Sequence, residues 1–214
     1  MARKEDISSS VIKRLPRYYR FIGELINQGR TRISSADLAS QMSLTASQIR
    51  QDLNCFGGFG QPGCGYSLPE LHSEIGHILG LDRHRKAVLI GAGNLGRAIA
   101  IHMKFENFGL ELCGIFDNDE NKTGLTVAGM KILPMKDIED FINRECPVAA
   151  ILCIPKESAE KCADMLVGCG IKAFWNFSHY DLATKHKDIV VENVHLGDSL
   201  MLLSYGLTNS ENDF

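Results

Sequence analysis

The sequence lacks several features that mark whole classes of protein. It has no apolar run long enough to cross a membrane, and its first ten residues lack the apolar core of a secretory signal. Its seven cysteines, an odd number, include no Cys-x-x-Cys pair and no Cys/His spacing typical of a metal site. These absences argue against a disulfide framework, a membrane protein and a structural metal. We expect a reduced, cytoplasmic protein with neither a membrane nor a metal among its partners.

The chain also lacks a large net charge, but its positive and negative residues are unevenly distributed. The formal net charge is -3, yet residues 1–52 contain nine Lys or Arg against five Asp or Glu, a balance of +4. The rest of the chain therefore carries -7. A basic amino-terminal segment suits contact with a polyanion, although charge alone does not distinguish this from an ordinary solvated surface.

Residues 10–28 are predicted to form a helix at the start of the first folded region. Apolar side chains recur there at helical spacing, and Gly29 is a typical residue at a helix end. A second helix is expected after Ser34, because Ser34 followed three residues later by Asp37 resembles a capping arrangement. A short turn at 42–44 comes next, which is the order of elements in a helix-turn-helix motif.

A capping box formed by Thr45 and Gln48 opens the next helix, expected over Ala46–Leu53. The segment 56–66 is rich in glycine and aromatic residues and predicts two short strands around a turn. A further helix is expected over Leu68–Leu79. We therefore predict a winged helix-turn-helix domain, a fold that binds DNA.

The helix after the turn has the composition of a DNA-recognition helix. Its apolar residues share one face, and its outer faces carry polar side chains that pair with base edges in a major groove. The alternative is a small helical dimerisation domain, but the capping box, the basic segment and the predicted wing together favour DNA. The residues expected to contact DNA are Lys13, Arg14, Arg17, Ser47, Gln48, Arg50, Gln51 and, on the wing, Gln61.

Beyond residue 86 strands alternate with helices, which predicts a parallel α/β sheet. The expected strands cover residues 87–90, 112–116, 149–154 and 172–176. The C-terminal segment is apolar and is expected to be helical. We predict three parts: a winged-helix domain over residues 1–80, a Rossmann-type domain over 81–195, and a C-terminal helix and tail over 196–214.

A glycine-rich loop directly follows the first of these strands and opens a helix. In its Gly-x-Gly-x-x-Gly pattern, the first glycine permits a tight turn and the second lets the backbone approach a pyrophosphate. The third lets the helix pack closely on the strand. This context predicts a dinucleotide site, the alternatives being a fold that binds nothing or one that binds coenzyme A. The predicted phosphate loop is Gly91-Ala92-Gly93-Asn94-Leu95-Gly96.

Asp117 lies 21 residues after Gly96, at the end of the second predicted strand. A carboxylate at this position accepts hydrogen bonds from the adenosine ribose and repels a 2′-phosphate. The expected cofactors are therefore NADH and NAD+ rather than their phosphorylated counterparts.

The residues needed for dehydrogenase chemistry are missing. Tyr180 is followed four residues later by Thr184 rather than by the Lys of a Tyr-x-x-x-Lys pair. No zinc ligand set is recognisable, and the chain is too short for a separate substrate domain. We therefore expect no enzymatic activity, with an NAD-dependent oxidoreductase kept as the alternative function.

Taken together, these stretches resemble the Rex family of redox-sensing transcriptional repressors along nearly the whole chain. The matching stretches lie in the amino-terminal helices, the wing, the glycine loop and several later strand ends, and they occur in the same order as in the family. The matching stretches are residues 14–21, 34–38, 48–53, 56–57, 63–66, 91–96, 116–117, 154–155, 170–173, 176–177 and 191–194.

The resemblance implies a homodimer that binds a palindromic double-stranded operator through two winged helices. It implies that the C-terminal helix is exchanged between subunits, and that NADH favours a closed form that leaves the DNA. Further cofactor-binding residues are expected by the same resemblance at Cys153, Ile154, Pro155, Asn176 and Phe177.

Two departures from the family pattern concern its switch between subunits. Arg20 is retained, but His195 stands where the family usually has an Asp, and His102 stands where it usually has a Tyr. A histidine does not replace a carboxylate opposite an arginine. We therefore expect NAD(H) binding to survive and its coupling to DNA binding to be weakened.

The cysteines raise a separate hypothesis. Cys153 stands where the family usually has Thr, and Cys55 and Cys64 flank the wing. Direct sensing of oxidants by these thiols is one interpretation, and buried cysteine acting as a small apolar residue is the one we favour.

Overall fold

The computed structural model describes residues 7–57, 60–61 and 65–211 and divides the chain into two compact units, Met1–Asp82 and Arg83–Phe214. The boundary lies two residues after the one predicted, and the C-terminal helix is grouped with the second unit. Within the described ranges, no helix is both long enough and apolar enough to cross a membrane.

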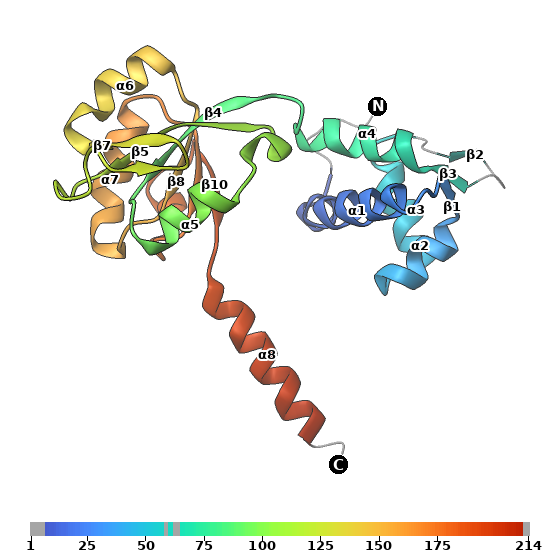
Figure 1. Cartoon of the computed structure of the whole chain (residues 1–214). Coiled ribbons are helices and arrows are strands. Elements are labelled where there is room, and N and C mark those ends of the chain that lie inside the picture. The colour runs from blue at the N-terminus through green and yellow to red at the C-terminus, as the bar shows by residue number, and fades with distance from the viewer. Residues whose placement is uncertain (1–6, 58–59, 62–64, 212–214) are drawn as a thin grey trace. The chain divides into compact units, whose positions relative to one another are not determined.

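The first unit contains the elements expected of a winged helix-turn-helix domain. Two short strands that flank the predicted wing pair with each other, and a third strand, which the sequence analysis missed, joins them in the order β1-β3-β2. The elements are α1 (Ser9–Asn27), β1 (Arg32–Ile33), α2 (Ser35–Met42), α3 (Ala46–Asn54), β2 (Gly60–Gln61), β3 (Gly65–Ser67) and α4 (Leu68–Leu79) (Figure 1).

Both predicted caps of the helix-turn-helix are confirmed. The Ser34 hydroxyl accepts a hydrogen bond from the backbone N–H of Asp37, and the Thr45 hydroxyl accepts one from that of Gln48. Each bond satisfies a backbone donor that the first turn of a helix leaves unpaired. Behind them the helices enclose one apolar core that includes the fully buried side chain of Tyr18.

The second unit is built on a seven-stranded sheet in the order β10-β9-β8-β4-β5-β7-β6. Every pairing is parallel except that of β6 with β7. The six parallel strands therefore have the order of a dinucleotide-binding Rossmann sheet. The strands are β4 (Arg85–Ile90), β5 (Leu110–Asp117), β6 (Thr126–Val127), β7 (Met130–Pro134), β8 (Ala149–Leu152), β9 (Ala173–Asn176) and β10 (Val190–Asn193).

Helices cover both faces of this sheet (Figure 1). The α5 helix (Asn94–His102) packs in the core on one face, and α6 (Ile138–Glu145) and α7 (Lys156–Gly168) pack in the core on the other. Successive residues of β4 alternate between these two cores, as the pleat of a strand requires. Burial on both faces explains why this strand is a continuous apolar run in the sequence.

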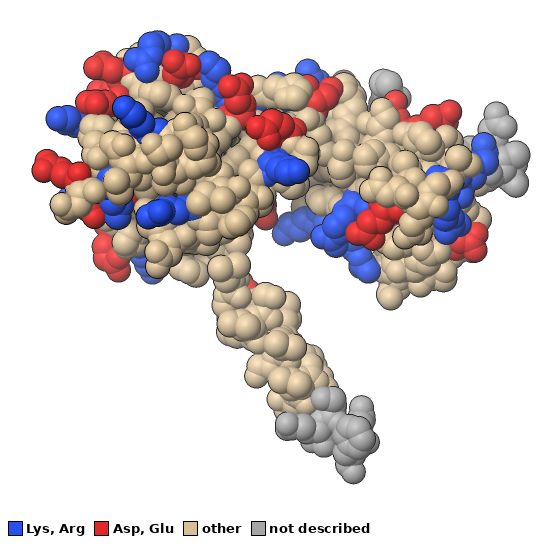
Figure 2. All heavy atoms as spheres, in the orientation of Figure 1, with Lys and Arg blue, Asp and Glu red and all other residues tan. Residues whose placement is uncertain are grey.

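The C-terminal helix α8 (Leu196–Glu211) begins at the first residue of the segment predicted as a C-terminal helix and tail. Large apolar side chains along it are more than half exposed to solvent. Figure 2 shows that its surface carries almost no Lys, Arg, Asp or Glu. The exposed side chains are Leu196, Leu200, Met201, Leu202, Leu203, Tyr205 and Leu207.

Candidate dinucleotide pocket and DNA-binding surface

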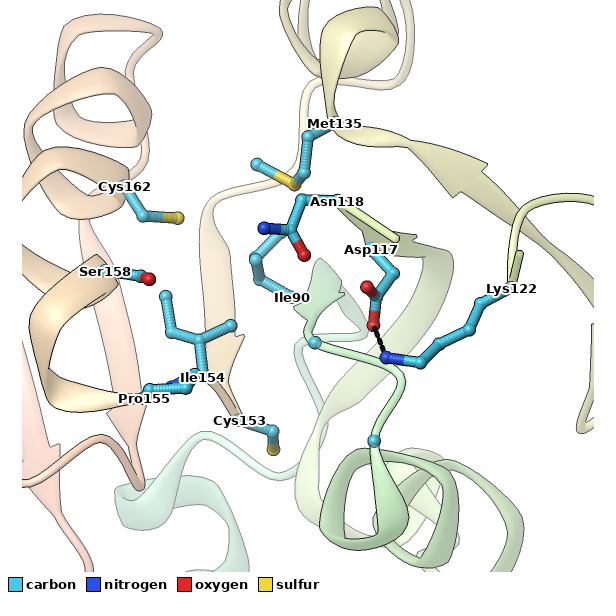
Figure 3. A pocket seen from close by; sticks show the side chains of 12 residues that line it. Ile90, Asp117, Asn118, Lys122, Met135, Cys153, Ile154, Pro155, Ser158 and Cys162 are labelled. Atoms are coloured by element: carbon cyan, nitrogen blue, oxygen red, sulfur yellow. Dashed lines mark hydrogen bonds and ion pairs between the residues drawn. The ribbon is translucent and has the colours of Figure 1, made fainter. Parts of the chain in front are cut away.

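A pocket of about 480 Å³ lies at the carboxyl ends of β4, β5 and β8. The strand order reverses between β4 and β8, and open parallel sheets bind their ligands at this point. The lining residues, most of them labelled in Figure 3, are Ile90, Gly91, Gly93, Asp117, Asn118, Lys122, Met135, Cys153, Ile154, Pro155, Ser158 and Cys162.

The three glycines of the loop have the geometry that a dinucleotide requires. Gly91 has φ +96°, and a Cβ there would collide with the carbonyl oxygen of Cys153. A Cβ on Gly96 would collide with the carbonyl oxygen of Gly91, so this glycine sets the close packing of α5 on β4. Space is open around Gly93, where a phosphate would approach. These observations fit the three roles predicted from the sequence.

Helix α5 begins at Asn94, inside the glycine loop, with Gly93 as its N-cap. The amides of Asn94, Leu95 and Gly96 therefore belong to its first turn, where backbone donors have no acceptor within the helix and favour anions. The amide of Ala92 has a different role, because it donates a hydrogen bond of 2.7 Å to Asp117 Oδ2. This bond fixes the loop against the end of β5.

Asp117 is almost fully buried and already has several protein partners. Besides Ala92, the amide of Asp119 donates to its Oδ1 at 2.9 Å, and Lys122 Nζ lies 3.1 Å from its Oδ2 (Figure 3). Together with that of Asp119, its carboxylate raises the pKa of Lys122, chiefly through the hydrogen bond to Asp117. The carboxylate thus stands at the predicted position, but its charge is locally compensated.

Sequence reasoning missed several pocket residues that come from the segments following the strands. Asn118 and Lys122 lie in the segment after Asp117, Met135 follows β7, and Ser158 and Cys162 lie on α7. Their signal was available in principle, since the ligand crevice of such a sheet is always formed by residues beyond the strand ends. Strand β7 was not predicted, so the position of Met135 was not recognised.

The side chain of Asn176, which was expected to contact the cofactor, is held by hydrogen bonds within the protein. Its side-chain amide donates to the carbonyl of Tyr180 and to Oδ1 of Asn193, and its oxygen accepts from the amide and hydroxyl of Ser178. An asparagine side chain has two donors and two acceptor positions, and all four are used. Asn176 therefore ties β9 to β10, while Phe177 packs edge-on against Trp175.

Burial raises the pKa of the Cys153 thiol to about 12. A thiol at neutral pH in this position is not a thiolate and is a poor nucleophile. Cys64 lies outside the described residues, and Cys55 donates to the carbonyl of Gln51. The favoured interpretation, cysteine as an apolar lining residue, fits Cys153.

Several predicted DNA-contacting residues form a network inside the first unit instead. Arg14 makes two hydrogen bonds, of 2.6 and 2.8 Å, to the carboxylate of fully buried Asp52. Tyr18 and Gln48 donate to the same carboxylate at 2.7 and 2.8 Å. Arg14 and Gln48 therefore join α1 to α3, and their expected contact with DNA stays a prediction.

Two further arginines brace the helix-turn-helix. Arg17 donates to the carbonyl of Met42 at the end of α2, and Arg50 donates to the hydroxyl of Ser35. Both side chains remain exposed, as do those of Lys13, Ser47 and Gln51. Figure 2 shows Lys and Arg gathered over α1. The backbone of Gln61 lies in β2, but its side chain lies outside the described residues.

Comparisons with known proteins match both halves of the chain. Residues 6–54 match the family model "Putative DNA-binding protein N-terminus", and residues 82–180 match "CoA binding domain". A redox-sensing transcriptional repressor Rex from Thermoanaerobacter pseudethanolicus is 49% identical over 99% of this chain and 94% of its own length. The Rex of Clostridium perfringens is 46% identical, covering 99% of both chains. The chain belongs to the Rex family.

Solved Rex structures share the whole fold. RSP, in complex with β-NAD+ and operator DNA, matches with a TM-score of 0.89 and 49% identity, covering 96% of this chain and 94% of that one. RSP in complex with β-NADH matches with a TM-score of 0.89 and 47% identity, covering 96% of both chains. The resemblance inferred from sequence motifs is thus confirmed, and so is the combination of a winged helix with a Rossmann sheet.

The three residues expected to form the Rex switch lie in different surroundings. Arg20 is exposed on α1 and His102 is exposed at the end of α5. His195 pairs with His179, their Nδ1 atoms being 2.8 Å apart and their rings stacked. One ring must donate and the other accept in this contact, so at least one of them is neutral.

The described part of the chain holds no cluster of three metal-ligating side chains.

Proposed function

We propose that this Rex protein is a transcriptional repressor that senses the NADH/NAD+ ratio. Two subunits bind a palindromic operator, and NADH favours release from it. The observation that carries the proposal is the pocket at the strand-order reversal, with its open space at Gly93, on a chain that also has an exposed recognition helix. The RSP structures support both ligands, since one contains NAD+ with operator DNA and another contains NADH.

Sensing by such a protein is a matter of linked equilibria. NADH lowers DNA affinity only if it binds the DNA-free form more tightly than the DNA-bound form, and the operator then weakens NADH binding by the same factor. No turnover of the cofactor is required. We therefore propose a non-enzymatic role in the cytoplasm, which accords with the named function of the relatives.

We further propose that α8 is the dimerisation element and is exchanged between subunits. Leu200, Leu202 and Leu203 are between 60% and 73% exposed, and isolated helices of this composition are stabilised by burying such residues against a partner. A symmetric dimer would also place two recognition helices for the two halves of a palindrome.

Coupling between the two ligands is proposed to be weaker than in relatives that carry an acidic residue in place of His195. The side chain of His195 already pairs with His179, and it offers Arg20 no negative charge. Without that contact, NADH has less differential affinity for the closed form.

The direct test is a gel shift on a palindromic operator of the family type, with NADH and NAD+ in parallel. We expect DNA binding with NAD+ and weaker binding with NADH. Operator binding that is insensitive to both dinucleotides would contradict redox sensing, and no binding to any such operator would contradict repression.

Coenzyme A remains a second candidate ligand, because residues 82–180 match a family model named for it. Asp117 at the end of β5 suits the unphosphorylated ribose of NAD. A thermal-shift comparison of NADH, NAD+ and acyl-coenzyme A distinguishes the two candidate ligands. Stabilisation by acyl-coenzyme A alone would favour coenzyme A over NAD(H).

A further inference from the structure

The helices α1 and α4 of the first unit lie side by side (Figure 1), and two stacked rings join them. Tyr19 lies on α1 and His72 on α4, with their ring centroids 3.9 Å apart and their planes inclined by 21°. Both side chains are half-buried. Neither residue lines the dinucleotide pocket or belongs to the recognition helix α3, so the stack has no part in the sites described above.

Each ring lies against a glycine of the opposite helix. A Cβ on Gly76 would lie 3.1 Å from a ring carbon of Tyr19, and a Cβ on Gly23 would lie 3.2 Å from Nε2 of His72. Each helix therefore supplies one ring and, four residues along, one glycine, which places both on the same face. Glycine inside a helix lowers the stability of that helix, so two such glycines indicate that this close packing is a defined feature of the domain.

The surroundings of His72 on its own helix favour the neutral ring. Burial lowers the pKa of His72 below its usual value, because a charged imidazolium in this contact is deprived of water. The residues three and four positions away on α4, which share its face, do not titrate. They are Leu68, Pro69, Ile75 and Gly76.

The elements packed against α4 bring no compensating negative charge to His72. These elements are α1 and β3, and their titratable side chains nearest to the contact are Tyr19, Arg20 and Tyr66. The arginine is a cation and disfavours a second positive charge beside it. Burial is the cause of the lowered pKa, and the carboxylates of α1 and α4 that are nearest in sequence are exposed: Glu24, Glu70 and Glu74.

We propose that the Tyr19–His72 stack is a pH-sensitive contact, and that mild acidification weakens operator binding by loosening α4 from α1. Helix α1 carries Lys13 and Arg17, exposed basic residues that are expected to contact DNA, and α4 is the last helix before the end of the unit at Asp82. A protonated ring favours a form in which it regains water. The effect on the operator rests on the proposed function, whereas the pH sensitivity of the contact does not.

The effect has a definite sign and a definite pH window. Because the pKa of His72 is lowered in the folded state, the neutral ring contributes stability that is fully present above the unfolded value of about 6.5. This stability is lost as pH falls from that value through the folded one. The window lies above the range of carboxylate titration, near pH 4, so the contribution of Asp52 does not overlap with it.

The contact itself is tested by an NMR titration of the histidine rings in the full chain between pH 8 and pH 5. The signal of His72 is the one absent from His72→Phe, a variant that keeps an aromatic ring but takes up no proton. We expect this signal to titrate below the usual value of about 6.5. Tyr19→Leu uncovers one face of the ring and should move the midpoint toward that value, which also identifies the signal independently of His72→Phe.

The effect on DNA is tested by fluorescence anisotropy with a family-type operator and saturating NAD+ at pH 7.5 and pH 5.5. The unmodified chain is compared with His72→Phe and His77→Gln. His77 is an exposed histidine of the same helix that pairs with Asp82, so its variant controls for loss of one titratable ring. Acidification changes the charge of every histidine, and the comparison with His72→Phe isolates the contribution of His72.

We expect the Kd of the unmodified protein to rise about threefold or more on acidification, relative to the change in His72→Phe. The variant His77→Gln should behave as the unmodified chain does. A preserved response in His77→Gln together with a lost response in His72→Phe would support the stack as the sensitive contact.

Three results would overturn the inference. A His72 signal that titrates at or above about 6.5 would mean that the charged ring gains more from the face of Tyr19 than it loses by burial. Equal pH dependence of operator binding in the unmodified chain and His72→Phe would contradict the link to DNA while leaving the proposed function intact. Absence of operator binding by all three proteins at both pH values would contradict the proposed function together with this role of the stack.

Discussion

Asp52 is the residue on which the geometry of the first unit most depends. Burial alone would raise its pKa, but the hydrogen bonds from Arg14, Tyr18 and Gln48 outweigh burial and hold it below its usual value. Their three side chains come from α1 and α3, so one carboxylate sets the relation between these helices. Arg14 and Gln48 therefore help to fix the position of α3.

Replacing Arg14 should destabilise the first unit. In Arg14→Leu the buried carboxylate of Asp52 loses its charged partner, which we expect to cost about 3 kcal/mol in the free energy of unfolding. Urea denaturation at pH 7 measures the loss. Lys13→Leu, an exposed neighbour on α1, is the matched control and should change stability little; an equal effect of both variants would contradict the assigned role of the network.

The same carboxylate predicts a dependence of stability on pH. A lowered pKa in the folded state contributes stability that is present above the unfolded value, about 4, and is lost as pH falls through the folded value. We therefore expect the unmodified protein to lose stability below about pH 4, and Asp52→Asn to lose less over the same interval. Denaturation midpoints at pH 7 and pH 3 measure this, and parallel curves for the two proteins would refute the prediction.

Cys153 should be chemically inert despite lining the pocket. Its pKa of about 12 leaves almost no thiolate at neutral pH. We expect iodoacetamide to modify exposed Cys146 well before Cys153, as followed by mass spectrometry of the digested protein. Faster labelling of Cys153, or a loss of operator binding under peroxide that the unmodified chain shows and Cys153→Ser does not, would support direct thiol sensing.

At the scale of elements, α8 offers the clearest prediction. Leu200→Asp combined with Leu203→Asp places two charges on its exposed apolar surface, and burying either in an interface would be costly. We expect a shift from dimer to monomer in light scattering after size exclusion. Asn209→Asp, an exposed change near the end of the same helix, should leave the dimer intact, and a dimer in all three proteins would exclude α8 from the interface.

The elements predicted from sequence are those with a strong local signal. The caps at Ser34 and Thr45, the apolar run of β4 and the glycine loop each have a direct local cause, and all are confirmed. Strand β6 was missed because it has only two residues, and α6 was missed because no side-chain cap marks its start. Short elements like these are stabilised mainly by the sheet on which they pack.

The residues of the candidate site also differ in whether a local sequence pattern identifies them. Residues on the loop and at the strand end were found because their backbone roles have a sequence pattern. Lys122 was missed, and the hydrogen-bond partners of Asn176 were not foreseen, because each depends on a group brought near by the fold. The partner of Arg14 was missed for the same reason, because the buried carboxylate of Asp52 is brought to it by the fold.

At the scale of the whole molecule, the coupling between dinucleotide and DNA is the property to measure. We expect the ratio of operator affinities with NAD+ and NADH to be small in the unmodified protein. His195→Asp should enlarge it by restoring a negative charge opposite Arg20. His179→Ala removes only the partner of His195 and should not enlarge it. A large ratio of operator affinities with NAD+ and NADH in the unmodified protein would contradict the hypothesis of weakened coupling.

The link between the sheet and the C-terminal helix is short. Only Val194 and His195 separate β10 from α8, and the amide of Val194 is still bonded to the carbonyl of Asn176. The backbone torsions around His195 therefore set the direction of a helix about 24 Å long. A rotation of about 25° at that single pivot would carry the far end of the arm roughly 10 Å. In the proposed dimer, a small change in the torsions at His195 would therefore alter the spacing of the two subunits.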